Sequence, residues 1–412
     1  MTKKSDAPAI RFKGFSDAWE QRKLNEVVNV YDGVHQTPDY KESGVMFLSV
    51  ENISTLKSEK YISEEAFQRD YKVYPQKGDI LMTRIGDVGT PNVVETTEKV
   101  AFYVSLALLK PTKINSYFLC NSIQSPLFQK GLKDRTLVTA IPQKINKDEI
   151  GKVNIILPTS SQEQQLIGEY FANLDRLITL HQRKFEKLTN VKKSMLEKMF
   201  PQNGSSYPEI RFKGFTDPWE QRKLSELTSM HARIGWQNLR TSEFLDSGDY
   251  MLITGTDFND GAINFSTCHY VERERYEQDR NIQIHNGSIL ITKDGTLGKV
   301  AYVQGLSMPA TLNAGVFNVQ IKDANNVDER YLFQYLKAPF LMDYVDKKAT
   351  GGTIKHLNQS ILVDFPVILP QRSEQILIGA FFQQLDNLIT LHQRELEKLQ
   401  NIKKSMLEKM FV

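Results

Sequence analysis

The sequence has few cysteines, no long apolar run and almost no net charge. Cys120 and Cys268 are the only two cysteines, and neither belongs to a CxxC motif, so we expect neither a disulfide framework nor a zinc site. The longest apolar stretch, AFYVSLALL from Ala101, is far too short to cross a membrane. The N-terminus lacks the apolar segment of a signal peptide. We therefore expect a cytoplasmic protein with no membrane contact.

The sequence also lacks the motifs of a catalytic subunit. It contains no G-x-x-x-x-G-K-[ST] loop, and no G-x-G segment follows a strand as S-adenosylmethionine binding would require. DPW at Asp217 lacks the second proline of the D-P-P-[WFY] motif of amino-methyltransferases. We expect no active site, no metal and no cofactor in this chain. The net charge of +3, from 52 basic and 49 acidic residues, neither requires nor excludes nucleic acid.

What the sequence does contain is an internal duplication. IRFKGFSDAWEQRKL begins at Ile10, and IRFKGFTDPWEQRKL begins at Ile210. A second pair of segments, residues 174–200 and 385–411, agrees at 22 of 27 positions. The chain is therefore a head-to-tail repeat with near-identical ends and divergent middles, and we expect a pseudo-two-fold arrangement.

The second pair of segments predicts two long helices. Apolar residues recur every three or four positions in both copies, which is the pattern of a coiled coil. SSQE from Ser160 predicts a capping box at the start of the first helix. His181 and His392 interrupt the two stripes at their midpoints, so we expect the helices to pack antiparallel and cross there. The residues predicted at this helix or partner interface are Leu174, Leu177, His181, Leu188, Leu385, Leu388, His392 and Leu399.

The divergent middles predict mixed, mainly β domains. KGDILMTRIGDVG from Lys77 and NGSILITKDGTLG from Asn286 each read as a short apolar strand followed by a G-x-x-G turn. We thus predict an α+β fold in which two mainly β domains are joined by two long antiparallel coiled-coil helices. The predicted boundaries are 1–158 for the first domain, 159–202 for the first helix, 203–370 for the second domain and 371–412 for the last helix.

Polar residues on loops supply the candidate DNA contacts. Arg84 and Lys293 hold equivalent places before the glycine turns, where a cation beside exposed backbone N–H groups suits a phosphate or a guanine edge. Irregular polar stretches begin at Tyr31 and His231 and contain groups able to contact base edges. Solvated hairpin tips and ordinary turns would use the same residues. The full candidate set is Thr83, Arg84, Gly86, Gly89, His35 and Gln36 in the first half and Thr292, Lys293, Gly295, Gly298, Arg233, Trp236, Gln237 and Asn238 in the second.

The two blocks resemble a known family. Each divergent block ends in LP…EQ…LI…LD.LITLHQR, which resembles the specificity subunit of type I restriction–modification systems, and IRFKGF…WEQRKL is similar to the start of each of its target recognition domains. The resemblance covers nearly the whole chain. It implies a non-enzymatic subunit whose two recognition domains each read one half of a bipartite, asymmetric target in double-stranded DNA. It also implies helices that dock two partner subunits and space the half-sites.

The same resemblance implies the partners. These are two modification subunits, which carry S-adenosylmethionine and methylate adenine at N6, and restriction subunits, which add translocation and cleavage driven by ATP and Mg. The alternative from another class is a tandem RNA-binding protein that uses the G-x-x-G loops, as K-homology domains do. Those domains place the motif between two helices, however, and would not need two long matched helices.

Overall fold

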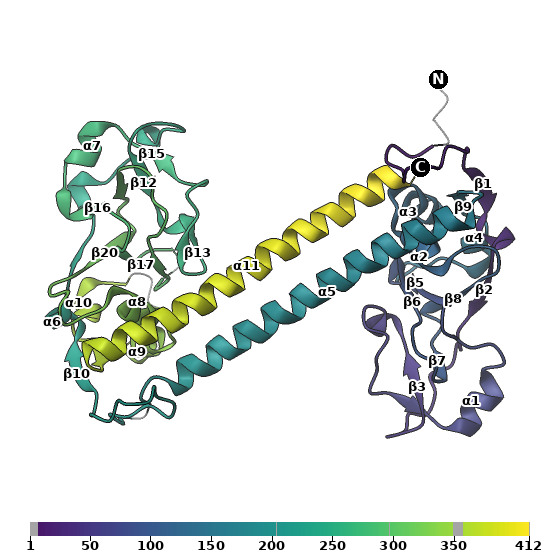
Figure 1. Cartoon of the computed structure of the whole chain (residues 1–412), viewed down its shortest axis with the longest axis horizontal. Coiled ribbons are helices and arrows are strands. Elements are labelled where there is room, and N and C mark those ends of the chain that lie inside the picture. The colour runs from purple at the N-terminus through teal and green to yellow at the C-terminus, as the bar shows by residue number, and fades with distance from the viewer. Residues whose placement is uncertain (1–6, 203, 296, 349–356, 412) are drawn as a thin grey trace. The chain divides into compact units, whose positions relative to one another are not determined.

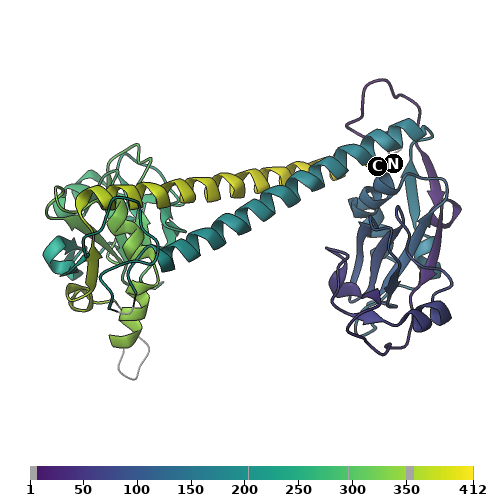
Figure 2. The ribbon, with the colours of Figure 1, turned by 60° about the horizontal axis from the view of Figure 1, so that its bottom comes forward.

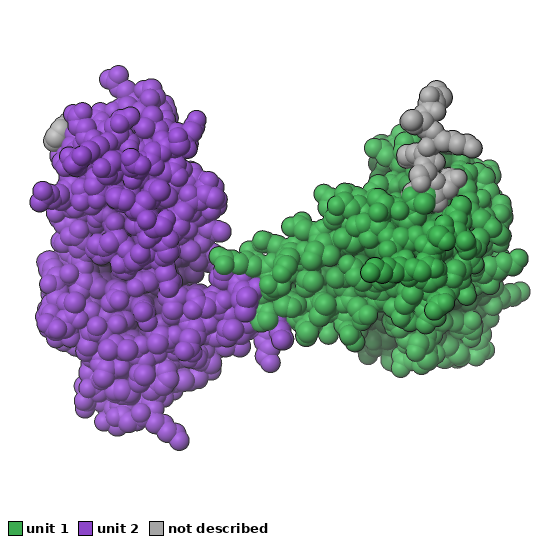
Figure 3. Space-filling view, turned by 45° about the horizontal axis from the view of Figure 1, so that its top comes forward, with its two compact units in different colours: residues 1–183, 392–412 green, residues 184–391 purple. Residues whose placement is uncertain are grey.

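The computed structural model, shown in Figure 1, describes residues 7–202, 204–295, 297–348 and 357–411. The chain forms two compact units, coloured in Figure 3. Unit 1 consists of residues 1–183 and 392–412, and unit 2 consists of residues 184–391. The two long helices, α5 (Ser161–Lys198) and α11 (Arg372–Met410), each begin in one unit and end in the other. The predicted boundaries, which treat each helix as a segment of its own, stay a prediction.

Unit 1 is built on a four-stranded antiparallel sheet in the order β2-β8-β5-β6. A three-stranded sheet, β4-β3-β7, and the pair β1-β9 complete it, with β3 and β7 parallel. The strands are β1 (Glu20–Lys23), β2 (Val28–Asp32), β3 (Val45–Leu48), β4 (Tyr61–Ile62), β5 (Ile80–Ile85), β6 (Asp87–Val93), β7 (Val100–Phe102), β8 (Leu106–Pro111) and β9 (Asn154–Leu157). The short helices are α1 (Glu64–Asp70), α2 (Ser116–Gln124), α3 (Pro126–Lys133) and α4 (Lys147–Gly151).

Unit 2 repeats this topology from a different sequence. Its main sheet has the order β11-β20-β17-β18, and the pair β10-β21 stands where β1-β9 stands in unit 1. A second sheet, β15-β12-β19-β16, and the pair β13-β14 are its further strands. The strands are β10 (Glu220–Lys223), β11 (Thr228–His231), β12 (Met251–Ile253), β13 (Phe258–Asn259), β14 (Ala262–Ile263), β15 (His269–Tyr270), β16 (Gln283–Ile284), β17 (Ile289–Thr292), β18 (Val300–Tyr302), β19 (Ala310–Leu312), β20 (Val316–Ile321) and β21 (Pro366–Leu369). The short helices are α6 (Leu224–Leu227), α7 (Arg273–Glu277), α8 (Glu329–Lys337), α9 (Phe340–Lys348) and α10 (Gln359–Val363).

The repeated IRFKGF…WEQRKL segments tie each domain to the start of a long helix. In unit 1, Arg11 donates from Nε and Nη2 to the two carboxylate oxygens of Glu163, at 2.6 and 2.8 Å. In unit 2, Arg211 makes the same fork to Glu374, at 2.8 Å for both bonds. Both glutamates are fully buried. Each lies in the first turn of its helix, where the helix dipole favours a negative charge.

This use of Glu163 changes the predicted capping box. The Ser160 hydroxyl accepts a hydrogen bond from the Glu163 backbone N–H at 3.4 Å, which is the expected half of the box. The Glu163 carboxylate instead accepts both bonds from Arg11. The sequence identified the helix start correctly, but the Glu163 carboxylate binds Arg11, 152 residues away, and not the backbone at the helix start.

Removing one of these buried charges is expected to destabilise the domain. Glu374→Gln leaves the Arg211 guanidinium against a neutral amide, and we expect the free energy of unfolding to fall by roughly 3 kcal/mol. Urea unfolding followed by circular dichroism measures the change. Glu209→Gln is the matched control, because Glu209 pairs with Lys198 at the surface and its loss should hardly matter. Equal midpoints for the two variants would contradict the assigned role.

The ends of the two long helices fill equivalent places. In unit 2, Phe200 packs against Trp219 and Phe382, with ring centroids 6.3 and 5.8 Å away. In unit 1, Phe411 packs against Trp19 and Phe171, with ring centroids 6.4 and 5.7 Å away.

The backbone around these aromatic rings matches as well. Ile210 N–H donates to Lys198 O at 2.9 Å, and Ile10 N–H donates to Lys409 O at 3.0 Å. Figure 2 shows the end of α11 reaching the first domain. Residues 409–411 therefore do for unit 1 what residues 198–200 do for unit 2.

Candidate nucleic-acid interface and helix pair

Arg84, at the end of β5, is buried with only 5% of its surface exposed. Its Nε donates to the Ile145 carbonyl at 3.0 Å, and Nη1 pairs with the Asp32 carboxylate. Burial lowers the pKa of the Arg84 guanidinium from its ordinary value. The prediction that Arg84 lies at the DNA surface is therefore wrong. Its guanidinium turns into the domain because a carboxylate and a carbonyl there satisfy its donors.

Thr83 and Thr292 are also buried, so the predicted DNA contacts are wrong for both. The Thr83 hydroxyl accepts from Thr90 N–H at 2.9 Å, and the Thr292 hydroxyl accepts from Lys299 N–H at 3.0 Å. Each hydroxyl fixes the turn that follows its strand. Lys293 is half-buried, with its amino group 5.5 Å from the centre of the Phe317 ring, so it is only partly available to a ligand.

The two glycines of each G-x-x-G turn have different tasks. All four have positive φ, which favours glycine. A Cβ on Gly89 would meet Leu132 at 2.8 Å, and one on Gly298 would clash with the Met342 sulfur. Gly89 therefore lets α3 pack closely against its turn in unit 1, and Gly298 lets α9 pack closely against its turn in unit 2. Cβ atoms on Gly86 and Gly295 would meet nothing within 4 Å, so only the first glycine of each turn faces open space.

Arg233 is a second buried arginine, with 1% of its surface exposed. Its Nε donates to the Leu312 carbonyl at 3.0 Å, and Nη1 donates to Gln278 Oε1 at 3.1 Å. Burial lowers the pKa of this guanidinium too. Gln237 is buried beside it. The predicted base contacts of Arg233 and Gln237 are wrong, since both hold the loop in place from inside.

Other candidates in the polar loops do reach the surface. His35 and Gln36 are exposed after β2, and Asn238 is exposed after the short 3-10 turn Gly235–Gln237. The Trp236 side chain lies outside the described residues. A contact of these residues with DNA stays a prediction.

Sequence reasoning missed an exposed apolar hairpin between α3 and α4. Val138 is 65% exposed, Ile141 is 99% exposed and Leu137 is 45% exposed. Leu137 and Lys144 pair across its base. The available signal was the run LVTAIP, which is apolar but lies among charged residues and carries no helix or strand period.

The long helices pack antiparallel within each unit. In unit 1, Nδ1 of His181 lies 3.1 Å from Nδ1 of His392, and Lys403 binds Asp175 at 2.6 Å. In unit 2, Lys192 binds Asp386 at 2.5 Å. Residue numbers rise along α5 where they fall along α11, which is the predicted direction. The lysines stand 211 residues apart in the chain, as do the aspartates, so the ion pair is duplicated with the sequence.

The predicted interface leucines divide into buried and exposed sets. Leu174 and Leu385 are 8% exposed, and Leu188 and Leu399 pack against the domain cores. Leu177 and Leu388, in contrast, are 40% and 43% exposed. The turns next to them expose Leu180 on α5 and Leu391 on α11. Each long helix therefore leaves the same pair of leucines uncovered.

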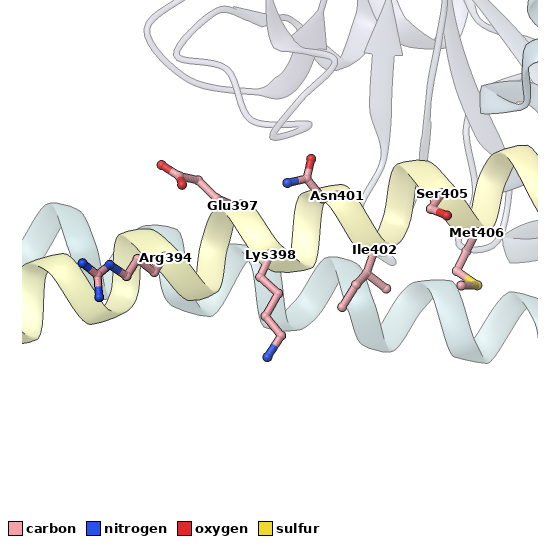
Figure 4. Close-up of a pocket in the computed structure, with 7 residues that line it drawn as sticks. All are labelled: Arg394, Glu397, Lys398, Asn401, Ile402, Ser405 and Met406. Atoms are coloured by element: carbon pink, nitrogen blue, oxygen red, sulfur yellow. The ribbon is translucent and has the colours of Figure 1, made fainter. Parts of the chain in front are cut away.

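A groove of about 540 Å³ runs along the second half of α11. Figure 4 shows Lys398 and Ile402 on one side of this helix and Glu397 and Asn401 on the other. The lining residues are Arg394, Glu397, Lys398, Asn401, Ile402, Ser405 and Met406. Six of the seven recur 211 positions earlier on α5, with Val191 in place of Ile402.

Within the part of the chain that the structure describes, no group of three His, Cys, Asp or Glu side chains could hold a metal ion. No helix among the same residues has both the length and the apolar character needed to cross a membrane.

Comparisons with known proteins find matches in both halves. A family model described as the type I restriction modification DNA specificity domain matches residues 16–190 and 216–401. The type I restriction enzyme MjaVIII specificity subunit of Methanocaldococcus jannaschii is 24% identical over 284 residues, which cover 67% of this chain and 65% of that protein. The putative MjaX specificity subunit of the same organism is 24% identical over 412 residues, which cover 94% of this chain and 92% of that protein.

A solved structure matches in fold. The crystal structure of the type I restriction-modification system S subunit from M. genitalium has a TM-score of 0.70 and 14% sequence identity, covering 98% of this chain and 99% of that chain. This likeness supports the fold, and it confirms the predicted class of two mixed domains joined by long helices.

Proposed function

The chain belongs to the type I restriction–modification DNA specificity family, and from this premise we propose that each of its two mainly β domains reads one half of a bipartite DNA target. Specificity subunits of this family are non-catalytic DNA-recognition subunits. Chemistry on the DNA would then come from partner subunits. The target would be asymmetric, because the two reading domains differ in sequence.

The observation that supports this proposal is that the two domains share one scaffold but differ in their loops. The main sheets of the two units have the same strand order, and both domains use the same Arg–Glu fork to hold a long helix. Their loops differ, however. A buried arginine supports the segment around Ile145 in one domain, and another supports the Gly235–Gln237 turn in the other. A protein that needs two specificities on one scaffold has this division of constant and variable parts.

The long helices would dock two modification subunits. Support comes from their duplicated surface: the same leucines are exposed on each helix, and the residues of the α11 groove recur on α5. Two equivalent surfaces suit two copies of one partner. The partner would be an adenine-N6 methyltransferase that brings S-adenosylmethionine, and restriction subunits would bring ATP and Mg.

The alternative, a tandem RNA-binding protein, has no support. Its G-x-x-G loop should lie between two helices, yet Gly86 and Gly89 lie in the hairpin of β5 and β6. Side chains of α3 occupy the space beside Gly89, so a nucleic-acid backbone cannot approach it.

The test is to express the chain with its modification subunit and map N6-methyladenine in the cellular DNA. We expect methylation at an interrupted sequence with two different half-sites, and none when the modification subunit is expressed alone. An uninterrupted target, or the same methylation without this chain, would contradict the proposal. Competition with RNA of the same sequence should leave binding to the DNA target unchanged.

A further inference from the structure

The most exposed apolar side chains among the described residues lie together in one hairpin of unit 1. This hairpin consists of residues 137–144, and Ile141 at its tip is 99% exposed. Val138 follows at 65%. Large apolar side chains held this far into water usually mark a surface that a partner covers.

The hairpin is held by a defined set of hydrogen bonds. Leu137 N–H donates to Lys144 O at 2.8 Å, which closes its base. Gly86 N–H donates to Gln143 O at 2.8 Å, and the Gln143 amide donates back to Gly86 O at 3.0 Å. The backbone of Gly86, the first glycine of the G-x-x-G turn, therefore holds this hairpin through its N–H and its carbonyl.

Arg84 fixes the C-terminal end of the hairpin. Ile145 N–H donates to Arg84 O at 3.0 Å, and Arg84 Nε donates to Ile145 O at 3.0 Å. The part-buried ion pair with Asp32 holds the guanidinium in this orientation. These hydrogen bonds fix both ends of the hairpin to the domain. The apolar side chains at its tip are therefore held in an exposed position.

The chain segment that carries the hairpin is basic. Residues 130–152 contain six Lys and Arg and three Asp and Glu. The net charge of this segment is therefore +3, the same as that of the whole chain. Two of the three acids are paired locally, Asp134 with Lys130 and Glu149 with Lys152. Lys133, Lys144 and Lys147 are exposed. An apolar tip on a basic segment matches a DNA groove, where phosphates flank apolar base faces and thymine methyl groups.

We propose that hairpin 137–144 enters a groove of the DNA at the half-site read by the first domain. Val138 and Ile141 contact bases or wedge against a base step, and Lys144 binds a neighbouring phosphate. Arg84 and Asp32 are positioning residues, which set the hairpin without touching DNA. The inference rests on the proposed function and adds to it the segment that reads one half-site.

The test uses the full chain assembled with its modification subunits. Ile141→Ser and Val138→Ser remove apolar contact at exposed sites, so the fold should be unaffected. We expect binding to the cognate duplex to weaken roughly ten-fold for each variant. Mapping of methylated sites should show relaxed sequence at one half-site and an unchanged sequence at the other. Val73→Ser is the matched control, because Val73 is an exposed valine of the same domain outside the hairpin.

Two further variants test the charge and the support. Lys144→Ala should reduce the slope of log affinity against log salt by about one. Arg84→Gln should relax the same half-site as Ile141→Ser. It should also speed hydrogen exchange in residues 137–145 while exchange in the β2-β8-β5 strands stays slow. An arginine that only stabilised the domain as a whole would instead speed exchange in those strands as well.

The outcomes separate this inference from the function on which it rests. If the wild-type complex reads no bipartite target, both fail. If the wild type reads one, and the Ile141→Ser and Val138→Ser variants read it with the same affinity and sequence, only the hairpin inference fails. If these variants lose the modification subunits in gel filtration, the hairpin is a protein contact and the inference is wrong.

Discussion

A fragment of residues 207–411 is expected to form a stable homodimer that reads a palindromic target. The core of unit 2 includes Met199 and Phe200 from the end of α5. The fragment lacks them but carries Met410 and Phe411 at the end of α11, which fill the equivalent place in unit 1. In a dimer, the α11 end of each copy can complete the core of the other. Lys409 O of one copy would accept the Ile210 N–H of the other, as it accepts Ile10 N–H in the whole chain.

Sedimentation equilibrium of the purified fragment measures the dimer. Methylation mapping with the modification subunit measures the target, which should contain the second half-site twice in inverted order. The matched control is a fragment of residues 207–391, which has the same domain but lacks the second half of α11. We expect it to be monomeric and to unfold at lower urea concentration, because nothing fills the Phe200 site. A well-folded monomeric 207–411 fragment would show that the helix ends are not interchangeable.

Lengthening both long helices by four residues is expected to widen the gap between the half-sites by one base pair. We place the insertions between Arg183 and Lys184 and between Leu391 and His392, where the chain passes from one unit to the other. The His181–His392 contact and the Lys192–Asp386 ion pair each lie inside one unit, so neither is separated. An insertion in one helix alone would shift one set of contacts against the other.

The physical reason combines length and rotation. Four residues add about 6 Å and about 40° of helical rotation. One base pair adds about 3.4 Å of duplex and about 34° of rotation in the same right-handed sense. The added length would allow up to two base pairs, but the rotation matches one. Both half-site sequences should stay unchanged, because no reading residue is altered.

Methylation mapping of the insertion variant checks this prediction. The control replaces four residues at the same two places without changing the length, and it should leave the spacing as in the wild type. Methylation at the original spacing by the insertion variant would show that the helices do not set the gap. New half-site sequences would show that the insertions disturb the reading domains.

The sequence by itself determined the duplicated plan, the two long helices and the strands that begin near Lys77 and Asn286. These features are local or repeated: a helix shows as a period of apolar residues, and a copied segment shows as identity at a fixed offset. The direction of helix packing also followed, because His181 and His392 mark the midpoints of two matched stripes and lie 3.1 Å apart in the structure. The family followed from the same repeated text.

Only the tertiary structure decided which polar residues face outward. Arg84 is adjacent to an exposed turn in the sequence, but its partners Asp32 and Ile145 are 52 and 61 residues away. Gly86 and Gly89 look alike in the sequence, yet a helix packs against only the second of them. Ile141 is a large apolar side chain, yet it is 99% exposed. Burial depends on which distant segments pack against a side chain, and composition and period along the chain carry no record of those neighbours.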